Sequence, residues 1–286
     1  MPVFDANGIP LYYEEAGSGE PVVLVHGTLC DHTVWQPQAD ALSAKYRTIA
    51  YSRRYAHPNI RQGDLMDSTV QNNTEDLAAF IDGLGLGKVH LVGHSYGGFI
   101  AAFFALKHPD SVGSLTLANA AIATMLVARQ SATASISLLF RSPSVAFSAR
   151  NLINATKDTV NAVDSGDATA AFRIFVPVLS NGRTDLPLKS PSFEAMVTRN
   201  ARTLRETTTP FPPVTKSEVG GIKVPTLVIW GALSAPWDYK VSQLLAQAIP
   251  GAEAAVVPGT GHFFLLENAT ATNEKMLKFL ESTHLR

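Results

Sequence analysis

VHLVGHSYGG, residues 89–98, joins an apolar run to a serine framed by glycines, and the apolar stretch Phe99–Leu106 follows. This order predicts a strand, a sharp turn and a helix. The residue at the apex of so tight a turn has a strained backbone, so the residues two positions before and after it must be small. Gly93 and Gly97 meet this requirement. They leave Ser95 at the apex, with its hydroxyl projecting beyond the end of the strand.

Two other segments suit a serine in that position. Upstream, the short apolar run Pro21–Val25 ends in His26-Gly27-Thr28. Downstream, the apolar residues 254–257 precede PGTGHF at residues 258–263. A serine hydroxyl is a poor nucleophile at its ordinary pKa and needs an adjacent base. His262, in a glycine-rich loop after a predicted strand, is the expected base.

The G-x-S-x-G motif around Ser95, followed late in the chain by His262, resembles the α/β-hydrolase family, and the resemblance covers most of the chain. It implies an α/β fold with a mostly parallel central sheet of about eight strands, flanking helices and an inserted helical cap. It also implies an oxyanion hole formed by two backbone N–H groups. These would come from Tyr96, the residue after the serine, and from Thr28, the residue after His26-Gly27.

The family's third catalytic residue, an acid that orients the histidine, is where this sequence departs from the pattern. The acid usually follows a strand in a motif similar to W-G-x-x-D. Here the strand Pro225–Gly231 is followed by ALSAP, and Ser234 occupies the place of the aspartate. Other members have the acid after the preceding strand. The corresponding segment, Leu115–Ala120, has Asn119 where the glutamate would stand.

Neither usual position therefore has a carboxylate. An asparagine can orient a histidine, so position favours Asn119 as the partner of His262. Asp238 is the alternative, although we expect it to begin a helix over Pro236–Gln247. Asp31, which follows the oxyanion loop, is a further candidate.

Composition narrows the class of protein. A chain of 286 residues that is 46% hydrophobic can bury one large core. A net charge of −1 without a basic run argues against a nucleic-acid partner, and no apolar run is long enough to span a membrane.

The single cysteine, Cys30, excludes an internal disulfide and fits a small buried residue in a reducing compartment, so we expect a cytoplasmic protein. The histidines lack metal-ligand spacing, so we expect no metal and no cofactor, only a small-molecule substrate. The oligomeric state stays open.

The chain outside the motifs also gives expectations. Val3–Glu15 predicts a hairpin that turns at Asn7-Gly8. Trp35–Lys45 and Thr74–Leu84 are expected to be helices. After the strand at Tyr46–Tyr51, many relatives have D-x-R-G, whereas this chain has Arg54 in place of the glycine. We expect the adjacent Arg53 to brace the loops beneath the site.

Strand signals fade between residues 121 and 213, and helical runs replace them. These runs are Ser131–Phe140, Val145–Val163 and Ala168–Leu179. The pattern predicts a core formed by residues 1–120 and 214–286, with a helical cap over residues 121–213. Because this segment is markedly apolar, we expect an apolar substrate pocket beneath it.

These observations predict an enzyme that hydrolyses a small, apolar ester or lactone through an acyl-enzyme. Ser95 would attack, His262 would act as base and then as acid, and Thr28 and Tyr96 would hold the oxyanion. The missing carboxylates favour an alternative, a non-hydrolytic cyclase, lyase or isomerase of the same fold. A ligand-binding relative is the third hypothesis.

Overall fold

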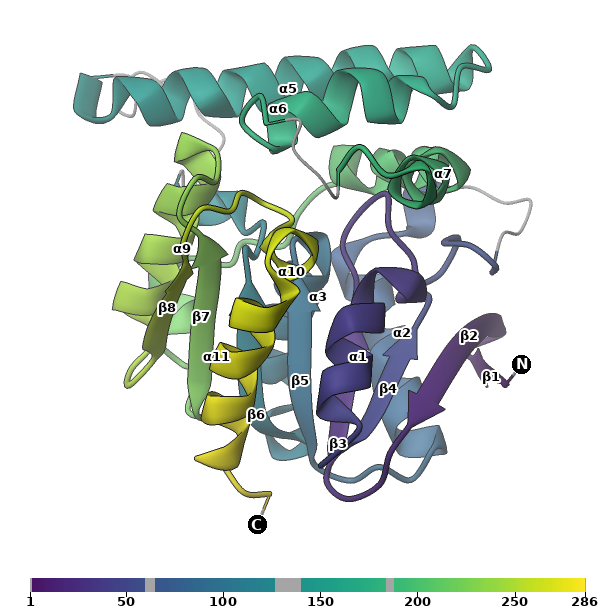
Figure 1. The fold of residues 1–286 in the computed structure, drawn as a ribbon, viewed down its shortest axis with the longest axis vertical. Helices are drawn as coiled ribbons and strands as arrows, with labels where there is room; N and C mark the ends of the chain where they lie inside the picture. The colour runs from purple at the N-terminus through teal and green to yellow at the C-terminus, as the bar shows by residue number, and fades with distance from the viewer. Residues whose placement is uncertain (1, 60–64, 127–139, 184–187, 286) are drawn as a thin grey trace.

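The computed structural model describes residues 2–59, 65–126, 140–183 and 188–285. Its centre is an eight-stranded sheet in the order β1-β2-β4-β3-β5-β6-β7-β8 (Figure 1). The strands are β1 (Val3–Ala6), β2 (Ile9–Ala16), β3 (Pro21–Val25), β4 (Arg47–Tyr51), β5 (Val89–His94), β6 (Val112–Ala118), β7 (Thr226–Gly231) and β8 (Glu253–Val257). All strand pairs from β4 to β8 are parallel. The α/β fold class expected from the sequence is confirmed.

The predicted hairpin is present. β1 and β2 pair antiparallel, with Ala6 opposite Ile9. Asn7 and Gly8 connect them with positive φ angles of 56° and 78°, the backbone of a two-residue hairpin turn. β2 then pairs antiparallel with β4, so this hairpin forms one edge of the sheet.

Helices cover both faces of the sheet. In Figure 1, α1 and α11 lie in front of the strands, and α2 and α3 lie behind them. Every residue of β5 and β7 is buried, as expected for central parallel strands. The helices outside the segment between β6 and β7 are η1 (His32–Trp35), α1 (Gln36–Leu42), η2 (Leu65–Asp67), α2 (Val70–Gly83), α3 (Tyr96–Lys107), η3 (Pro109–Ser111), α9 (Pro236–Ala248), α10 (Phe264–Glu267) and α11 (Ala269–Glu281).

Helix boundaries differ from the sequence-based expectation in both predicted helices. α2 begins at Val70 rather than Thr74, because the Thr69 side chain accepts a hydrogen bond from the backbone of Asn72 and caps the helix there. The expected helix Trp35–Lys45 is shorter in the structure, where α1 runs from Gln36 to Leu42 and the 3₁₀ helix η1 includes Trp35. Capping side chains decide such boundaries, and the hydrophobic period does not show them.

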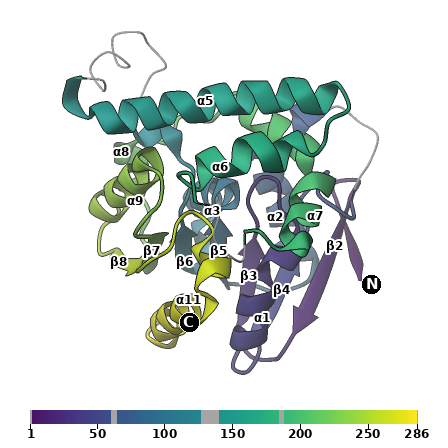
Figure 2. The ribbon, with the colours of Figure 1, turned by 45° about the horizontal axis from the view of Figure 1, so that its top comes forward.

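A helical segment lies between β6 and β7 in the chain. It contains η4 (Ala123–Met125), α5 (Pro143–Asp164), the π-helix η5 (Ala171–Phe175), α6 (Val176–Leu179), α7 (Pro191–Arg199), η6 (Ala201–Thr208) and α8 (Lys216–Val219). Figures 1 and 2 show α5 and α6 across the carboxyl ends of the strands. The expected helix Val145–Val163 corresponds to α5. The expected helix Ser131–Phe140 falls, apart from its last residue, outside the described residues, and the domain boundaries at 120/121 and 213/214 stay predictions.

No helix in the described ranges is both long and apolar enough to cross a membrane.

Candidate active site

Ser95 lies at the sharp turn between β5 and α3. Its backbone angles are φ 55° and ψ −120°, a strained conformation for a residue with a side chain. The turn is held by hydrogen bonds from the Ser95 N–H to the Ala118 carbonyl, 2.9 Å, and from the Gly98 N–H to the Ser95 carbonyl, 3.0 Å. The strand, turn and helix predicted from this motif are therefore present.

The glycines around Ser95 are required by close backbone approaches. A Cβ atom on Gly93 would overlap the Gly97 carbonyl, and one on Gly97 would overlap the Val25 carbonyl at the end of β3. A Cβ on Gly27 would lie 2.9 Å from the Cβ of Ser95. The loop after β3, which includes Thr28, therefore runs directly beside the serine.

His262 follows β8 and is buried beside the end of β5. His94 Nε2 donates to the His262 carbonyl at 3.0 Å, and the two imidazole centroids are 4.9 Å apart. On the other side, His262 Nδ1 donates to Asp238 Oδ2 at 2.7 Å, and both side chains are almost completely buried. Nε2 of His262 has no hydrogen-bond partner within the described part of the chain. The ring is thus oriented through Nδ1, and its Nε2 is not engaged by a described residue.

The prediction that Asn119 is the direct partner of His262 is wrong for hydrogen bonding, because Asp238 takes that position. Asn119 instead donates through Nδ2 to Asp238 Oδ2 and to Ser234 Oγ, the latter at 2.9 Å. Its Oδ1 accepts from the Gly231 N–H at 3.1 Å. The two residues in the family's usual acid positions therefore join a polar group around the carboxylate.

α9 explains this shift of the acid. The helix begins at Pro236, as expected, and its first turn directs Asp238 toward His262. We expected the start of a helix to weigh against Asp238, but the helix supplies the carboxylate. The available sequence signal was an acidic residue two positions after a proline that can begin a helix.

Asp31 is engaged elsewhere. Its carboxylate accepts from Arg199 Nε and from Asn200 Nδ2, each at 2.8 Å, and from Thr33 Oγ1 at 2.6 Å. Burial opposes the charge of Asp31, but these hydrogen bonds, led by that of Arg199, outweigh burial and lower its pKa to about 2. The third candidate acid thus anchors the start of η1 to α7 and η6.

Arg53 braces the loops beneath the serine, as expected. The Nε of Arg53 donates to the His26 carbonyl at 2.9 Å, and NH2 donates to the Gly27 carbonyl at 3.2 Å. The Arg53 backbone N–H also donates to His26 Nε2 at 2.9 Å, while His26 Nδ1 lies 2.8 Å from the Gly27 carbonyl. Burial and the Arg53 charge lower the pKa of His26 well below its usual value, which fits a neutral ring that accepts at Nε2.

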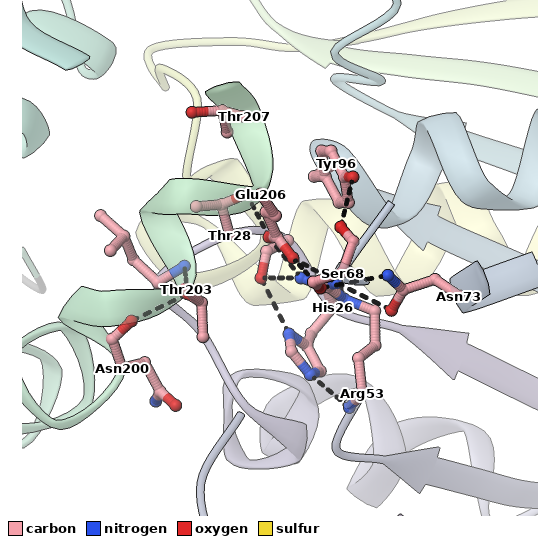
Figure 3. Close-up of polar contacts among 12 residues, drawn as sticks. His26, Thr28, Arg53, Ser68, Asn73, Tyr96, Asn200, Thr203, Glu206 and Thr207 are labelled. Carbon is pink, nitrogen blue, oxygen red and sulfur yellow. Dashed lines mark hydrogen bonds and ion pairs between the residues drawn. The ribbon is translucent and has the colours of Figure 1, made fainter. Parts of the chain in front are cut away.

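Glu206 is the buried partner of Arg53, and no motif or spacing in the sequence pointed to it. Each oxygen of its carboxylate accepts from one Arg53 nitrogen at 2.8 Å, and each side chain is 1% exposed (Figure 3). Burial disfavours the charge on Arg53, but Glu206 compensates, so the pKa of the guanidinium is raised. Glu206 lies on η6, where the helical segment returns toward the sheet.

A cavity of about 420 Å³ opens beside the serine. Ser95, Thr28 and Tyr96 are part of its lining, and α5 and η6 supply much of the remainder. Its apolar lining includes Ala121, Leu152, Val160, Phe175, Leu179, Phe211 and Trp237. α5 and η6 also contribute polar residues, among them Lys157 and Asn161. Mostly apolar walls with a few polar groups are typical of a site for a small organic ligand. The expectation of an apolar pocket beneath the helical segment agrees with this cavity.

Two other groups near the site are not placed for acid–base chemistry. Burial, with the nearby His262, lowers the pKa of His94 to about 3, so this ring is neutral at ordinary pH. Burial likewise raises the pKa of the Cys30 thiol, which is 1% exposed and packs as a small apolar side chain. Among the described residues, no group of three or more His, Cys, Asp or Glu side chains is arranged to hold a metal ion.

The chain is similar to proteins of known fold and named activity. A family model described as the alpha/beta hydrolase fold matches residues 20–269. A 2-hydroxy-6-oxononadienedioate/2-hydroxy-6-oxononatrienedioate hydrolase of Burkholderia vietnamiensis is 30% identical over 97% of this chain and 93% of its own. A putative carbamate hydrolase of Azorhizobium caulinodans is 27% identical over 98% of both chains. The solved structure of an esterase from Exiguobacterium antarcticum covers 98% of both chains with a TM-score of 0.78. At 20% identity, that likeness shows the fold alone.

Proposed function

Because the chain belongs to the α/β-hydrolase family and its curated relatives are named as hydrolases, we propose that it is a serine hydrolase of a small, apolar ester or lactone. The observation that carries this proposal is the buried His262–Asp238 pair, 2.7 Å between Nδ1 and Oδ2, held against His94, the residue before the strained turn at Ser95. A nucleophile, a base and a group that orients the base are the minimum for acyl transfer to serine.

The reaction proceeds in two steps. His262 Nε2 takes the proton of Ser95 Oγ as that oxygen attacks the substrate carbonyl, and it then gives the proton to the departing alkoxide. A water molecule next attacks the acyl-enzyme, again losing its proton to His262, and the acid is released as Ser95 regains its proton. Asp238 holds the Nδ1–H tautomer and stabilises the imidazolium formed in both steps.

The backbone N–H groups of Thr28 and Tyr96 are assigned to the oxyanion. Both residues line the cavity with Ser95, and Tyr96 is the first residue of α3, where the helix end favours negative charge. Preorganised donors of this kind stabilise the tetrahedral intermediate, and losing one typically lowers turnover by about 10²–10³.

Asn119 is assigned as a positioning residue for Asp238, and Ser234 accepts a second hydrogen bond from Asn119. Asn119 donates to Asp238 Oδ2, the same oxygen that accepts from His262. Two donors on one oxygen restrict the orientation of the carboxylate next to His262. Asn119 thus acts on the histidine through the aspartate.

The cavity supports a substrate of modest size. A volume of about 420 Å³ lies at the lower end of ordinary small-molecule pockets, about 300–1,000 Å³. Its largely apolar walls favour a hydrocarbon or aromatic acyl group over a charged one. The non-hydrolytic alternative was motivated by the missing carboxylate, and Asp238 removes that motive.

A serine-directed phosphonate and the variant Ser95→Ala test this proposal. The wild-type protein should be labelled stoichiometrically at Ser95 and should hydrolyse p-nitrophenyl butyrate. Ser95→Ala should fold normally, resist labelling and lose turnover by about 10⁵–10⁶, the size of effect seen when a serine nucleophile is removed. Exposed Ser282, substituted in the same way, is the control. Ester turnover that survives in Ser95→Ala would exclude Ser95 as the nucleophile.

A further inference from the structure

We propose that Glu206 is a positioning residue for the oxyanion hole, so that docking of η6 aligns the two backbone donors. This inference rests on the proposed function. Through this contact, the helical segment between β6 and β7 would align the oxyanion hole as well as cover the cavity.

Glu206 binds Thr28 directly. Thr28 Oγ1 donates to Glu206 Oε1 at 2.6 Å, on the same oxygen that accepts from Arg53 (Figure 3). A hydroxyl has one proton, so the Thr28 side chain is committed to η6 and its rotation about Cα–Cβ is fixed. The donor that Thr28 leaves for a substrate oxygen is its backbone N–H.

Glu206 also reaches Tyr96, through one intermediate residue. Ser68 Oγ donates to Glu206 Oε2 at 3.1 Å, and the Tyr96 hydroxyl donates to the Ser68 carbonyl at 3.1 Å. The guanidinium of Arg53, itself held by Glu206, lies 5.1 Å from the centre of the Tyr96 ring. One carboxylate is therefore connected to both residues of the proposed hole.

The backbone after Thr28 shows why such support is needed. Leu29 has a positive φ of 64°, which is unfavourable for a residue with a branched side chain. Its N–H donates to Thr203 Oγ1 at 3.0 Å, and Thr203 lies on η6 like Glu206. A strained conformation persists only where surrounding contacts determine it. Here η6 holds the loop at two successive residues, the Thr28 side chain and the Leu29 backbone.

The same η6 helix lines the cavity. Thr207 and Thr208 follow Glu206 directly and contribute to the lining. The helix that closes one wall of the substrate cavity is thus the helix that holds the oxyanion loop. When η6 is displaced, the hole should lose its alignment even though Ser95, His262 and Asp238 stay in place.

Thr28→Val is the variant that separates this role from general stability. Valine has nearly the same shape and keeps the backbone N–H, but it cannot donate to Glu206. Thr28→Ser restores the hydroxyl. Thr226→Val is the matched control, because the Thr226 hydroxyl likewise donates to one acceptor, the Val224 carbonyl, but Thr226 is the first residue of β7 and lies at the end of that strand away from Ser95.

The expected result is a selective loss of kcat. Because misplacing a catalytic donor by about 1 Å can cost up to about 10², Thr28→Val should lower kcat for p-nitrophenyl butyrate by about 10–100-fold with KM changed less than about threefold. Thr28→Ser should recover most of that loss, and Thr226→Val should change the melting temperature but not kcat. Glu206→Gln should show the same selective loss in kcat, with folding checked by circular dichroism.

The outcomes distinguish this inference from the function on which it rests. If the wild type hydrolyses the ester while Thr28→Val and Glu206→Gln stay within twofold of its kcat, Glu206 has no positioning role. A rise in KM alone would mean that the Thr28 hydroxyl contacts the substrate instead, and it would also overturn the inference. A wild type that neither turns over ester nor reacts with the phosphonate would overturn the proposed function, and the inference with it.

Discussion

Asp238→Asn tests the proposed acid with little change of shape. The variant keeps an oxygen that can accept from His262, and Asn119 helps to select which way the new amide faces. Asn119 Nδ2 donates to the same carboxylate oxygen as His262 Nδ1, so an oxygen is preferred there. The amide nitrogen then takes the place of Oδ1, which has no partner among the described residues. The His262 tautomer is kept, and the main loss is the negative charge.

The size of that loss follows from the distance. With Nδ1 and Oδ2 2.7 Å apart, the charge centres of imidazolium and carboxylate are about 4 Å apart. At an effective dielectric constant of about 20, their attraction is worth about 4 kcal/mol. At about 1.4 kcal/mol for each factor of ten, kcat should fall by about 10³. Loss of the tautomer as well would bring the effect to about 10⁴, the value known for a serine protease.

The assay is steady-state hydrolysis of p-nitrophenyl butyrate at neutral pH, with the melting temperature measured alongside. Asp110→Asn, an exposed carboxylate in η3, is the control for the chemical change. Asn119→Ala, which keeps Asp238 but removes its neighbouring donor, should show a smaller loss, about tenfold, since a positioning contact costs less than the charge. An Asp238→Asn enzyme that retains more than a tenth of wild-type kcat would refute the reasoning.

Two predictions concern stability. Because the folded-state pKa of His94, about 3, lies below the usual 6.5, the unfolded chain binds the extra proton between these values. His94 therefore contributes stability that is complete above about pH 6.5 and lost as pH falls toward 3, by about 1.4 kcal/mol per pH unit. When the free energy of unfolding is measured with urea at several pH values from 4 to 6, His94→Gln should reduce its dependence on pH. His284→Gln, at an exposed residue, should leave that dependence unchanged. An equal pH dependence in the wild type and both variants would disprove the assignment. Gly93→Ala should prevent folding or lower the melting temperature by more than 10 °C, because its Cβ overlaps the Gly97 carbonyl. Gly259→Ala, with open space but a φ of 72°, should cost only about 1–2 kcal/mol, and similar melting temperatures for the two variants would contradict the packing argument.

Local sterics made parts of this protein predictable from sequence. The requirement for small residues beside Ser95 acts over four positions of the chain, so Gly93 and Gly97 identify the turn without knowledge of the rest. The Asn7-Gly8 turn is specified in the same way, by two adjacent positive φ angles. Runs of apolar residues similarly indicated the buried parallel strands, since a central strand must be apolar on both faces.

The identity of the acid depended on tertiary structure. Motif spacing assumes that the loop after β7 has the same length in all members, and in this chain that spacing points to Ser234. The packing of α9 against the sheet instead moves the carboxylate to Asp238, which reaches His262 across 24 positions of the chain. Asn119, predicted as the partner itself, contacts that carboxylate from 119 positions away.

The sequence by itself determined the fold class, the turn that presents Ser95 and the loop that supplies His262, because each depends on residues that are neighbours in the chain. Only the tertiary structure decided how Asp238, Arg53 and Glu206 are paired. Glu206 meets Arg53 and Thr28 across 153 and 178 positions of the chain. A buried charge must find a partner, but composition and spacing do not say which one, because that choice is made when η6 docks on the loops at the carboxyl ends of the strands.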